Sequence, residues 1–491
     1  MAVAISSRRS RATFGSMQLA DPRKTGRTLA HHPRPHIVGS KVTRSQLVAA
    51  LLLCSVACKP AGEGVVVLEG ATLLNGSGGP AIRESLILIR DGHIQAVGRG
   101  DEIPVPRGAV RVSVAGKTII PGLIDAHARV ERWAAPRYLA WGVTTVRDLG
   151  AGGDSVFAVK NDLNLGTLTG PRMFTSGPMI DGAPPASPTA TGVTTELEAR
   201  RAVDLRGAAG ADYVAIHGRI TPPLMPTIMR EAETLRMAVA AHPGMMDALS
   251  VARAGVRSIE QLAGVVQAAV PNPAPFYQAH ARPFAGWAME EGQWGLLDSA
   301  TVASTARALA ATRVALVPTL VQHEMWSHLN DVSLRTRPTM SDVPASAASV
   351  RDVARLLERT GWITEHFAAF RRARARQDQF VREFKRAGGL VAAGTDAASE
   401  LLVPGAALHD ELELLVAAGF TGGEAIIAAT RKGAELLHAD SLGQIAAGAV
   451  ADLVVLNANP LDDIAATRDI AFVMSRGRIF YPDSLRRTWS R

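Results

Sequence analysis

Four short apolar runs in this sequence are each followed closely by a histidine or an aspartate. These residues are His127, His217, His242 and Asp396. Imidazole and carboxylate groups can bind a divalent metal or move protons, so all four are candidates for a functional site. A lone histidine in a folded domain is, however, more often a hydrogen-bonded structural group than a ligand. The residue types alone leave both interpretations open, and the elements that carry them decide whether they can meet.

These residues are expected at the ends of parallel strands. Between residues 118 and 442, short apolar runs alternate with longer stretches of helical periodicity. Repeated strand and helix units predict an α/β fold with parallel strands, and roughly eight units over about three hundred residues fit a (β/α)8, TIM-like barrel. A doubly wound open sheet is the main alternative. In both folds, functional side chains lie beyond the carboxyl ends of the strands, so the candidates are predicted to converge. The expected strands include 118–124, 143–146, 213–216, 238–241, 314–317 and 390–393.

Short β-type runs also occur on both sides of this region. On the N-terminal side they alternate with tight turns at Asn75-Gly76 and Asp91-Gly92, and on the C-terminal side Gly477 separates two similar runs. Each set is too small to enclose a core, so both are predicted to pair into one small β-sandwich. The predicted division is a leader at 1–62, an N-terminal sandwich segment at 63–117, the barrel at 118–445, a C-terminal sandwich segment at 446–485 and a tail at 486–491.

Two segments interrupt the strand and helix pattern, at 271–294 and 321–350. Long insertions at the functional end of a barrel are often lids or binding loops, and surface excursions are about as frequent. His323, in the second insertion, and His409, on a helical stretch, have no supporting motif of ligands around them. A structural role is therefore predicted for both, and it is also favoured for His217, which lacks such a motif as well.

The net charge of +8 arises from the first 44 residues, which contain nine Lys and Arg and one Asp. The rest of the chain is balanced, with 44 basic and 44 acidic residues. A neutral body lacks the basic surface that phosphate binding requires, which argues against a nucleic-acid partner. The expected partner is a small-molecule substrate.

An apolar run at 47–57 follows the basic stretch and is about half as long as a membrane span. This pattern predicts a signal peptide. The run ends in Ala57-Cys58, which resembles a bacterial lipoprotein cleavage box. The chain is therefore expected to be exported, periplasmic or membrane-anchored through lipid on Cys58, with a short buried helix as the alternative. Both cysteines, Cys54 and Cys58, lie in this leader, so no disulfide is expected in the body.

Several longer motifs occur in order between about residues 64 and 483. They are Pro121-Gly122-Leu123-Ile124-Asp125-Ala126-His127, Gly142-Val143-Thr144-Thr145-Val146-Arg147-Asp148, Gly394-Thr395-Asp396-Ala397, Leu408-His409-Asp410-Glu411-Leu412 and Gly443-Gln444-Ile445. This series resembles the metal-dependent amidohydrolase superfamily, specifically its imidazolonepropionase and prolidase-like branch. The resemblance implies a TIM-like barrel whose mouth holds one or two divalent metals that activate water against an amide, a lactam or a related bond.

The resemblance also implies which residues bind the metal. His127, His242 and Asp396 match ligand positions of the family, and Asp396 matches its proton shuttle as well. Two histidines and one carboxylate are in principle enough for one metal with open coordination positions. The implied cofactor is one divalent metal, expected to be zinc, in a reduced, mononuclear site.

Three other ligand positions are substituted in this chain. Arg129 replaces the second histidine of a His-x-His pair, Ala215 replaces a bridging lysine, and Gln261 replaces a further histidine. An arginine has no lone pair and repels a divalent ion. Two roles for Arg129 are equally open, an ion pair with Asp396 or a fork that holds a substrate carboxylate. His217, two residues beyond Ala215 on the same strand face, is expected on the substrate-binding side.

The predicted function is hydrolysis of a carbon–nitrogen bond in a small amide, lactam or dipeptide-like substrate with a reduced metal site. The alternative is a metal-free relative, a binding protein or pseudoenzyme, that captures an anionic small molecule through Arg129. A third hypothesis is metal-independent acid–base chemistry by His217 and a carboxylate. The sequence offers no distinctive partner for His217.

Overall fold

The computed structural model describes residues 64–150, 153–282 and 284–489. The predicted leader at 1–62, with its apolar run and Cys58, lies outside these residues, so export and lipidation of the chain stay predictions. None of the helices in the described ranges is long and apolar enough to cross a membrane.

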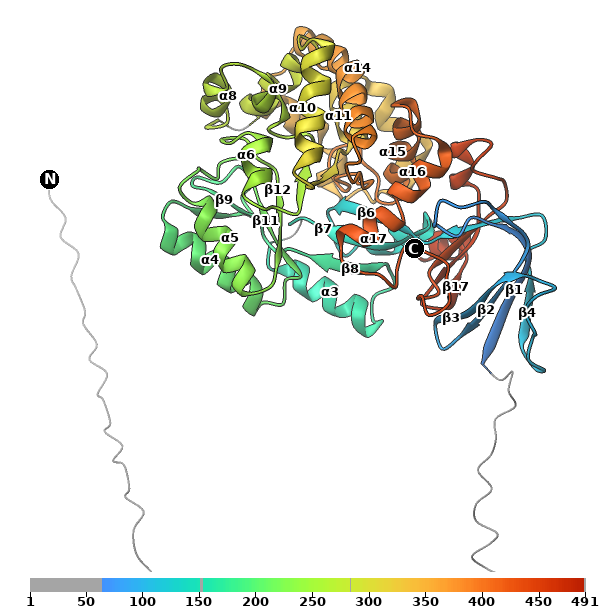
Figure 1. Cartoon of the computed structure of the whole chain (residues 1–491). Helices are drawn as coiled ribbons and strands as arrows, with labels where there is room; N and C mark the ends of the chain where they lie inside the picture. The colour runs from blue at the N-terminus through green and yellow to red at the C-terminus, as the bar shows by residue number, and fades with distance from the viewer. Residues whose placement is uncertain (1–63, 151–152, 283, 490–491) are drawn as a thin grey trace, which may run out of the picture. The chain divides into compact units, whose positions relative to one another are not determined.

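The middle of the chain alternates strands with helices, as predicted, and its strands run parallel to one another (Figure 1). Six strands form one sheet in the order β10-β9-β11-β12-β13-β14, and three form another in the order β6-β7-β8. Most of their residues are buried, as expected for parallel strands that are covered by helices. The bounds are β6 (Leu123–Ala128), β7 (Val143–Asp148), β8 (Arg172–Thr175), β9 (Ile180–Gly182), β10 (Thr191–Val193), β11 (Tyr213–Ile216), β12 (Ala238–Ala241), β13 (Ser258–Glu260) and β14 (Ala315–Val317).

The two parallel sheets contact each other on both sides. On one side, the N–H of Asp212 donates to the carbonyl oxygen of Thr175 at 2.8 Å, which joins β11 to β8. On the other side, isolated parallel bridges pair Leu316 with Val391 and Ala128 with Ala397. In the strand predicted at 390–393, only Val391 forms such a bridge, and within the described residues no single closed barrel is formed. The arrangement confirms the α/β class and brings the ends of β6, β11, β12 and β13 to one edge.

Helices cover the outer faces of these sheets. At the start of α4 (Glu196–Ala208), Thr195 and Glu198 form a capping box that satisfies free backbone N–H groups. Along α14 (Thr364–Arg386), an apolar stripe that includes Phe380 buries itself against the core. Figure 1 shows α14 beside α9 and α10, and these helices contact one another. Other helices of this layer are α3 (Ser155–Leu165), α5 (Met225–Thr234), α6 (Ala248–Arg253), α10 (Ser299–Ala311), α15 (Ala406–Ala417), α16 (Gly422–Ala428) and α17 (Arg431–Leu436).

Both predicted insertions are largely helical and pack together through aromatic rings. The ring of Trp287, from the first insertion, lies 5.0 Å from that of Trp326, from the second, and 5.0 Å from that of Trp362. Contacts of this kind add packing energy beyond simple burial. We call Phe284, Trp287, Trp326, Trp362 and Phe370 the aromatic cluster. The insertion elements are α8 (Ala274–Ala279), α9 (Ala285–Trp294), α11 (Leu320–Ser327), η1 (Val332–Thr336), η2 (Pro338–Asp342) and α12 (Ala348–Arg351).

The two outer segments of the chain form a separate eight-stranded sheet of mostly antiparallel pairs (Figure 1). β5, from the start of the predicted barrel, pairs with β1 on one side and β15 on the other, and an isolated bridge pairs His93 with Val450, so the two predicted segments do join in one sheet. The predicted two-layer sandwich is not confirmed, because all eight strands belong to one sheet in the order β17-β16-β15-β5-β1-β2-β3, with β4 beside β1. The bounds are β1 (Val65–Leu73), β2 (Ile82–Arg90), β3 (His93–Arg99), β4 (Val110–Ser113), β5 (Thr118–Pro121), β15 (Leu453–Leu456), β16 (Ile470–Ser475) and β17 (Arg478–Phe480).

The apolar run at 118–124 is divided between the two sheet systems instead of forming one strand. β5 ends at Pro121 in the antiparallel sheet, and β6 begins at Leu123 in the parallel one. Gly122 marks the change, because a Cβ atom there would lie 2.2 Å from Oγ1 of Thr144. The predicted tail also has structure, since α18 (Pro482–Trp489) places Trp489 against the guanidinium of Arg137.

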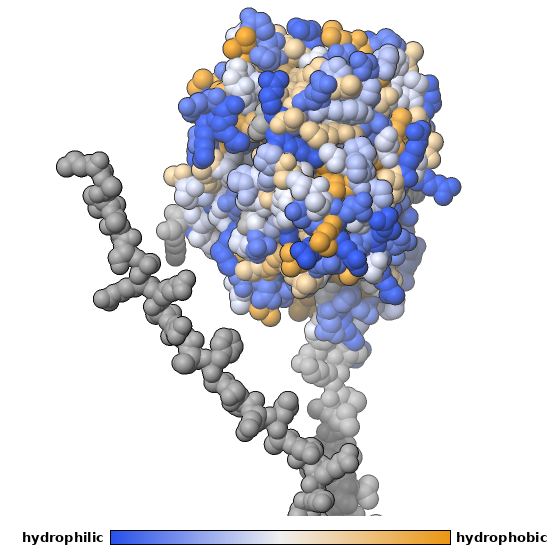
Figure 2. Space-filling view, turned by 90° about the vertical axis from the view of Figure 1, so that its left-hand side faces the viewer, coloured by the Kyte–Doolittle hydropathy of each residue, from blue (hydrophilic) through white to orange (hydrophobic). Residues whose placement is uncertain are grey.

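The face of the molecule in Figure 2 shows apolar residues scattered among hydrophilic ones. The exposed large apolar side chains of the described residues are spread over several elements, such as Leu165 on α3, Leu205 on α4 and Leu296 after α9. Single apolar residues on a surface are normal in globular proteins. They give no reason to expect a protein-binding surface on that face.

Candidate active site

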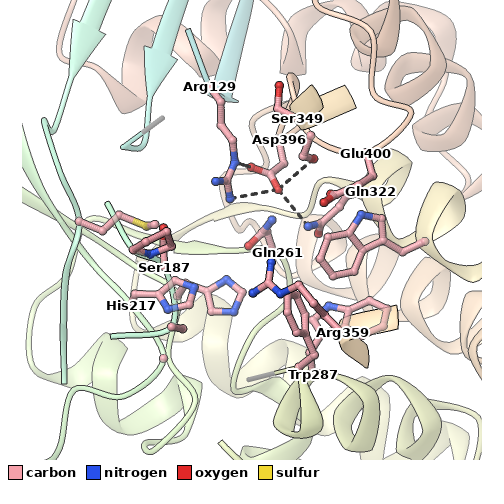
Figure 3. Close-up of a pocket in the computed structure, with 18 of the residues that line it drawn as sticks. Arg129, Ser187, His217, Gln261, Trp287, Gln322, Ser349, Arg359, Asp396 and Glu400 are labelled. Atoms are coloured by element: carbon pink, nitrogen blue, oxygen red, sulfur yellow. Dashed lines mark hydrogen bonds and ion pairs between the residues drawn. The ribbon is translucent and has the colours of Figure 1, made fainter. Parts of the chain in front are cut away.

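Asp396 is the centre of a polar network at the ends of the parallel strands (Figure 3). Its carboxylate accepts hydrogen bonds from Arg129 Nε at 2.6 Å, Gln322 Nε2 at 3.0 Å and Ser399 Oγ at 3.4 Å. Burial alone would raise the pKa of Asp396, but the charge of Arg129 and the hydrogen bonds from Arg129 and His127 lower it well below its usual value. The carboxylate is therefore ionised at neutral pH. Its predicted role as proton shuttle stays a prediction.

His127 lies between two carboxylates. Its Nδ1 is 2.8 Å from Oε2 of Glu260, and its Nε2 is 3.4 Å from Oδ1 of Asp396. Burial lowers the pKa of His127, but hydrogen bonds to Asp396 and Glu260 outweigh it and raise the pKa to about 8. Both ring nitrogens then carry protons and donate them. In this state the ring has no lone pair for a metal.

Glu260 continues the network to a second arginine. Arg147 Nη2 donates to Oε1 of Glu260 at 2.6 Å, and Arg147 Nη1 donates to Oγ of Ser258 at 3.0 Å. Burial would raise the pKa of Glu260, but the charge of Arg147 and the contacts of His127 lower it. The buried groups thus form a chain of alternating charge, from Arg147 through Glu260, His127 and Asp396 to Arg129. We call these five residues the charge chain.

Arg147 lies in the motif from Gly142 to Asp148, and Glu260 directly precedes Gln261, but the sequence predicted no role for either. The available signal was that both charges lie in apolar runs, because a buried charge needs an opposite charge nearby. Arg147 and Glu260 are only 3% and 2% exposed, which makes such a partner obligatory. The pairing itself depends on how β7 and β13 face each other across the interior, and the sequence does not show this.

Backbone contacts fix the end of β6 against the segment that carries Asp396. The carboxylate of Asp125 accepts from the N–H groups of His127 and Thr395 and from the hydroxyl of Thr395. Burial raises the pKa of Asp125 to about 7 despite these bonds. A Cβ atom on Gly394 would lie 2.8 Å from the backbone nitrogen of His127, so this close approach requires glycine.

His217 and His242 lie side by side at the ends of β11 and β12. Their rings are stacked with centroids 4.7 Å apart and planes 17° apart. Burial, together with the positive potential of His217 and other histidines, lowers the pKa of His242 well below its usual value, so His242 is neutral. His217 Nδ1 is 3.3 Å from Oδ2 of Asp181, a residue that no sequence pattern singles out.

Two cavities adjoin these residues. The outer one has a volume of about 300 Å³ and is lined by four of the predicted site residues, Arg129, His217, His242 and Asp396. The inner one, of about 20 Å³, is lined by His127 and again by Arg129, His217 and His242. A volume of this order holds about one water molecule. All five predicted site residues therefore border one of two cavities at the same edge, and Ala215 and Gln261, at substituted positions, line the inner one.

Several outer-cavity residues come from the insertions and were not predicted. Trp287 and Trp326 provide an apolar wall, and Gln322 approaches Asp396 (Figure 3). His280 reaches the wall as well, where its Nε2 is bonded to Glu290. Both insertions therefore contribute to the wall of the outer cavity, and their role as lids or binding loops stays a prediction. The sequence shows that these segments contain aromatic residues, but it does not show which of their side chains meet across the cavity.

The two histidines with a predicted structural role have structural contacts. His323 Nδ1 is 2.9 Å from Oε2 of the buried Glu291, and its Nε2 is 3.0 Å from the carbonyl oxygen of Gln261. His409 contacts the hydroxyl of Thr467 and the carbonyl oxygen of Trp141. Burial lowers the pKa of His409 to about 3, so it is neutral. Both rings link separate elements and do not enter the outer cavity.

The donor set does not fit the predicted zinc ion. Both nitrogens of His127 face carboxylates, and the Nε of Arg129 is 2.6 Å from an oxygen of Asp396 that a metal would need. Ala215 and Gln261 supply no imidazole or lysine at their positions. In the described part of the chain, no group of three or more His, Cys, Asp or Glu side chains is arranged to hold a metal ion. The predicted set of His127, His242 and Asp396 is brought together, but as part of an ion-pair network.

Several solved structures are similar to this chain. A "putative prolidase from Bifidobacterium longum" has 26% identity and a TM-score of 0.65, over 87% of this chain and 99% of that one. A bottromycin amidohydrolase has 24% identity and a TM-score of 0.65, over 90% and 92% of the two chains. A Xaa-Pro dipeptidase with bound methionine in the active site has 20% identity and a TM-score of 0.63, over 85% and 100%. No curated protein matches the sequence.

The model of the amidohydrolase family matches residues 118–480. This span is more than half of the chain and contains all parallel strands and every residue of both cavities. Enzymes of this family generally use divalent metals, and the prolidase-like structures have the TIM-like barrel that the parallel strands indicate. The match supports a hydrolase that acts on carbon–nitrogen bonds. The chain belongs to the amidohydrolase family.

Proposed function

We propose that the outer cavity hydrolyses a carbon–nitrogen bond in a small amide, lactam or dipeptide-like molecule, and that the charge chain occupies the place of the divalent-metal centre. The family match and the 26% identity to the Bifidobacterium longum protein support the reaction class. One observation carries the proposal about the metal centre, the 2.6 Å ion pair between Arg129 Nε and Asp396 Oδ1.

The energetic basis of this proposal is charge repulsion. Two like unit charges about 4 Å apart repel by about 4 kcal/mol at an effective dielectric of about 20, so the charge of Arg129 offsets much of the attraction between Asp396 and a divalent ion. Protonated His127 adds to this repulsion. The same two cations already neutralise Asp396. A fixed guanidinium therefore supplies the positive charge that a metal would supply to the carboxylate.

A second candidate function is binding of an anionic small molecule without turnover. Arg129 favours it, because its side chain is 31% exposed and lines the outer cavity although its Nε is paired with Asp396. A guanidinium can bind two carboxylates through different edges of its fork. In this alternative the protein is a metal-free relative that captures an anion through Arg129.

We also propose that residues 390–393 form the eighth strand of a barrel. Its other seven strands are β6, β7, β8, β11, β12, β13 and β14. The supporting contacts are the bridge from Val391 to Leu316 and the hydrogen bond of 2.9 Å from the N–H of Ala126 to the carbonyl oxygen of Ala393. With the contact of Asp212 and Thr175 on the other side, these bonds would close a ring.

Elemental analysis combined with an activity panel tests the proposed function. The purified protein is incubated with zinc or manganese, desalted and measured for metal, and then assayed on dipeptides, N-acyl amino acids and lactams with and without chelator. We expect less than about a tenth of an equivalent of metal and hydrolysis that resists the chelator. A full equivalent of bound metal that hydrolysis requires contradicts the charge-chain proposal. Binding of anionic amides without hydrolysis supports the second candidate instead.

A further inference from the structure

We infer that His217, oriented by Asp181, is the residue that moves the proton in this cavity. The inference rests on the proposed metal-free hydrolysis and names the group that replaces a metal-activated water. The third hypothesis from the sequence was acid–base chemistry by His217 and a carboxylate, for which the sequence offered no distinctive partner. Asp181 supplies that carboxylate.

The fold places the two residues next to each other. His217 directly follows β11, and Asp181 lies within the neighbouring parallel strand β9. There Ile216 pairs with Ile180, and the N–H of His217 donates to the carbonyl oxygen of Ile180 at 2.9 Å. From this position His217 Nδ1 reaches Oδ2 of Asp181 at 3.3 Å. The separation is set by backbone pairing, so the side chains need no loop movement to meet.

Asp181 is built as a fixed anion. It is fully buried, and its carboxylate accepts from the N–H groups of Arg219 at 2.7 Å, Ala186 at 2.8 Å and Gly182 at 2.9 Å. Burial raises the pKa of Asp181, but the contacts with His217 and these N–H groups outweigh it and lower the pKa. An ionised carboxylate can only accept, so the Nδ1 of His217 must donate. The lone pair of neutral His217 is then on Nε2.

His217 differs from the other imidazoles of the site in having this nitrogen available. The side chain of His217 is 25% exposed and lines both cavities, and its Nε2 makes no hydrogen bond to the described residues. Both nitrogens of His127 face carboxylates, and His280 Nε2 is bonded to Glu290. His242 Nδ1 also has no hydrogen-bond partner among the described residues, but it is buried, whereas the side chain of His217 is partly exposed. The flat stacking of His242 on His217 holds the plane of that ring.

The proton transfer follows from this arrangement. A water oxygen forms a bond to the carbonyl carbon of the substrate amide while His217 Nε2 accepts one proton of that water, and the carbonyl electron pair moves to oxygen. When the carbon–nitrogen bond breaks, the proton passes from His217 Nε2 to the leaving nitrogen, which departs as an amine. The products are a carboxylic acid and an amine, so atoms and charge balance without a further reactant.

Arg129 is available to the developing oxyanion. It lines the same two cavities as His217, and its cation does not depend on pH. Fixed positive groups aimed at a developing negative charge lower the barrier for acyl transfer. The oxygens of Asp396 already accept hydrogen bonds from Arg129, Gln322 and Ser399, whereas Nε2 of His217 has no such partner among the described residues.

Three variants test the inference, with activity measured on the best substrate of the panel in the presence of chelator. We expect His217→Gln to lower kcat by about 10²–10⁴-fold with little change in KM, as for loss of a general base. Asp181→Asn should lower kcat by at least about tenfold, because the ring loses its fixed tautomer. His328→Gln is the matched control, since His328 forms a histidine–carboxylate pair with Glu324 and does not line either cavity. It should keep full activity.

Nitrogen-15 NMR of the imidazoles gives a readout that does not need turnover. The wild type should show His217 as the Nδ1–H tautomer, identified by the signal that His217→Gln removes, and Asp181→Asn should shift it toward Nε2–H while the other histidines keep their signals. Chelator-resistant hydrolysis that survives His217→Gln overturns the inference and leaves the proposed function intact. Hydrolysis that requires metal overturns the proposed function, and a wild-type Nε2–H tautomer then overturns the inference separately. Absence of any hydrolysis by the wild type overturns both.

Discussion

Single charges determine what the site can hold. Arg147, Glu260, His127, Asp396 and Arg129 alternate in sign, and all but Arg129 are almost fully buried. Each of the three inner members has an oppositely charged neighbour on two sides. Removing one member leaves a desolvated charge without its partner, and this costs more than the pair itself contributes. Each charge in the site is therefore held in place by its oppositely charged neighbours.

Asp396→Asn tests this at the position with the most partners. The change removes the ion-pair partner of Arg129 and leaves His127 with Glu260 alone, so we expect the free energy of unfolding to fall by about 3 kcal/mol, the lower end for a buried pair because Arg129 is 31% exposed. Urea denaturation at neutral pH measures the loss. Asp101→Asn is the control, because its partner Arg99 is as exposed as Asp101 itself, and it should leave the midpoint unchanged. Equal stability of Asp396→Asn and the wild type would contradict the charge chain.

The sequence predicted which residues meet at this site, but it did not predict their protonation states or their partner residues. His127, His217, His242, Arg129 and Asp396 converge because the carboxyl ends of parallel strands share an edge. Their protonation and partners depend on contacts across the interior. Glu260 lies 133 positions from His127 in the sequence, and no local pattern joins them.

Among the secondary-structure elements, α15 and α11 are linked by a buried carboxylate. Oε2 of Glu411, on α15, accepts from the N–H of Val321 at 2.7 Å in the first turn of α11, while its Oε1 has no hydrogen-bond partner. A negative charge is favourable at a helix N-terminus. Burial nevertheless raises the pKa of Glu411 to about 7. This contact positions α11, which carries Gln322 to Asp396.

Glu411→Gln should therefore change the pH dependence of stability. A carboxyl group whose pKa is raised in the folded state stabilises fully below its unfolded pKa of about 4.3, and this stability is lost as pH rises through about 7. We expect the free energy of unfolding of the variant, relative to wild type, to rise by about 2–3 kcal/mol from pH 5 to pH 8. Urea denaturation of both proteins at each pH measures the difference. The same difference at both pH values would show that Glu411 is not protonated in the folded protein.

The boundary between β5 and β6 is set by packing at Gly122. The sequence predicted one strand at 118–124 because the run is continuously apolar, and apolar character does not reveal which sheet a residue joins. Gly122→Ala places a methyl group 2.2 Å from Oγ1 of the buried Thr144, so we expect a loss of about 1–3 kcal/mol from overpacking. Gly292→Ala on α9 is the matched control, with its nearest atom at 4.0 Å, and helix propensity should make it neutral or stabilising. Thermal and urea unfolding compare the two; equal effects would rule out this packing explanation.

For the molecule as a whole, the sequence predicted the class of the core and the joining of the outer segments. Periodicity shows how elements alternate, and β15 pairs with β5 as the shortage of core in each segment required. The packing of the insertions was beyond such patterns. Trp287 and Trp326 come from different insertions, and their contact depends on the shape of the edge below them. The cavity wall is thus a property of the complete fold.

The stability of the whole molecule also provides a test of the charge chain, because any metal that binds the folded state adds to its unfolding free energy. We expect zinc and chelator to leave wild-type stability unchanged. Arg129→His combined with Ala215→Lys and Gln261→His restores the family's ligand types, and zinc at about a hundred times its Kd should then stabilise the triple variant by about 2.7 kcal/mol. The double variant Ala215→Lys with Gln261→His keeps the cation of Arg129 and should gain nothing. If the double variant binds zinc as tightly as the triple variant, the charge of Arg129 is not the barrier, and the lost ligands alone explain the difference from the family.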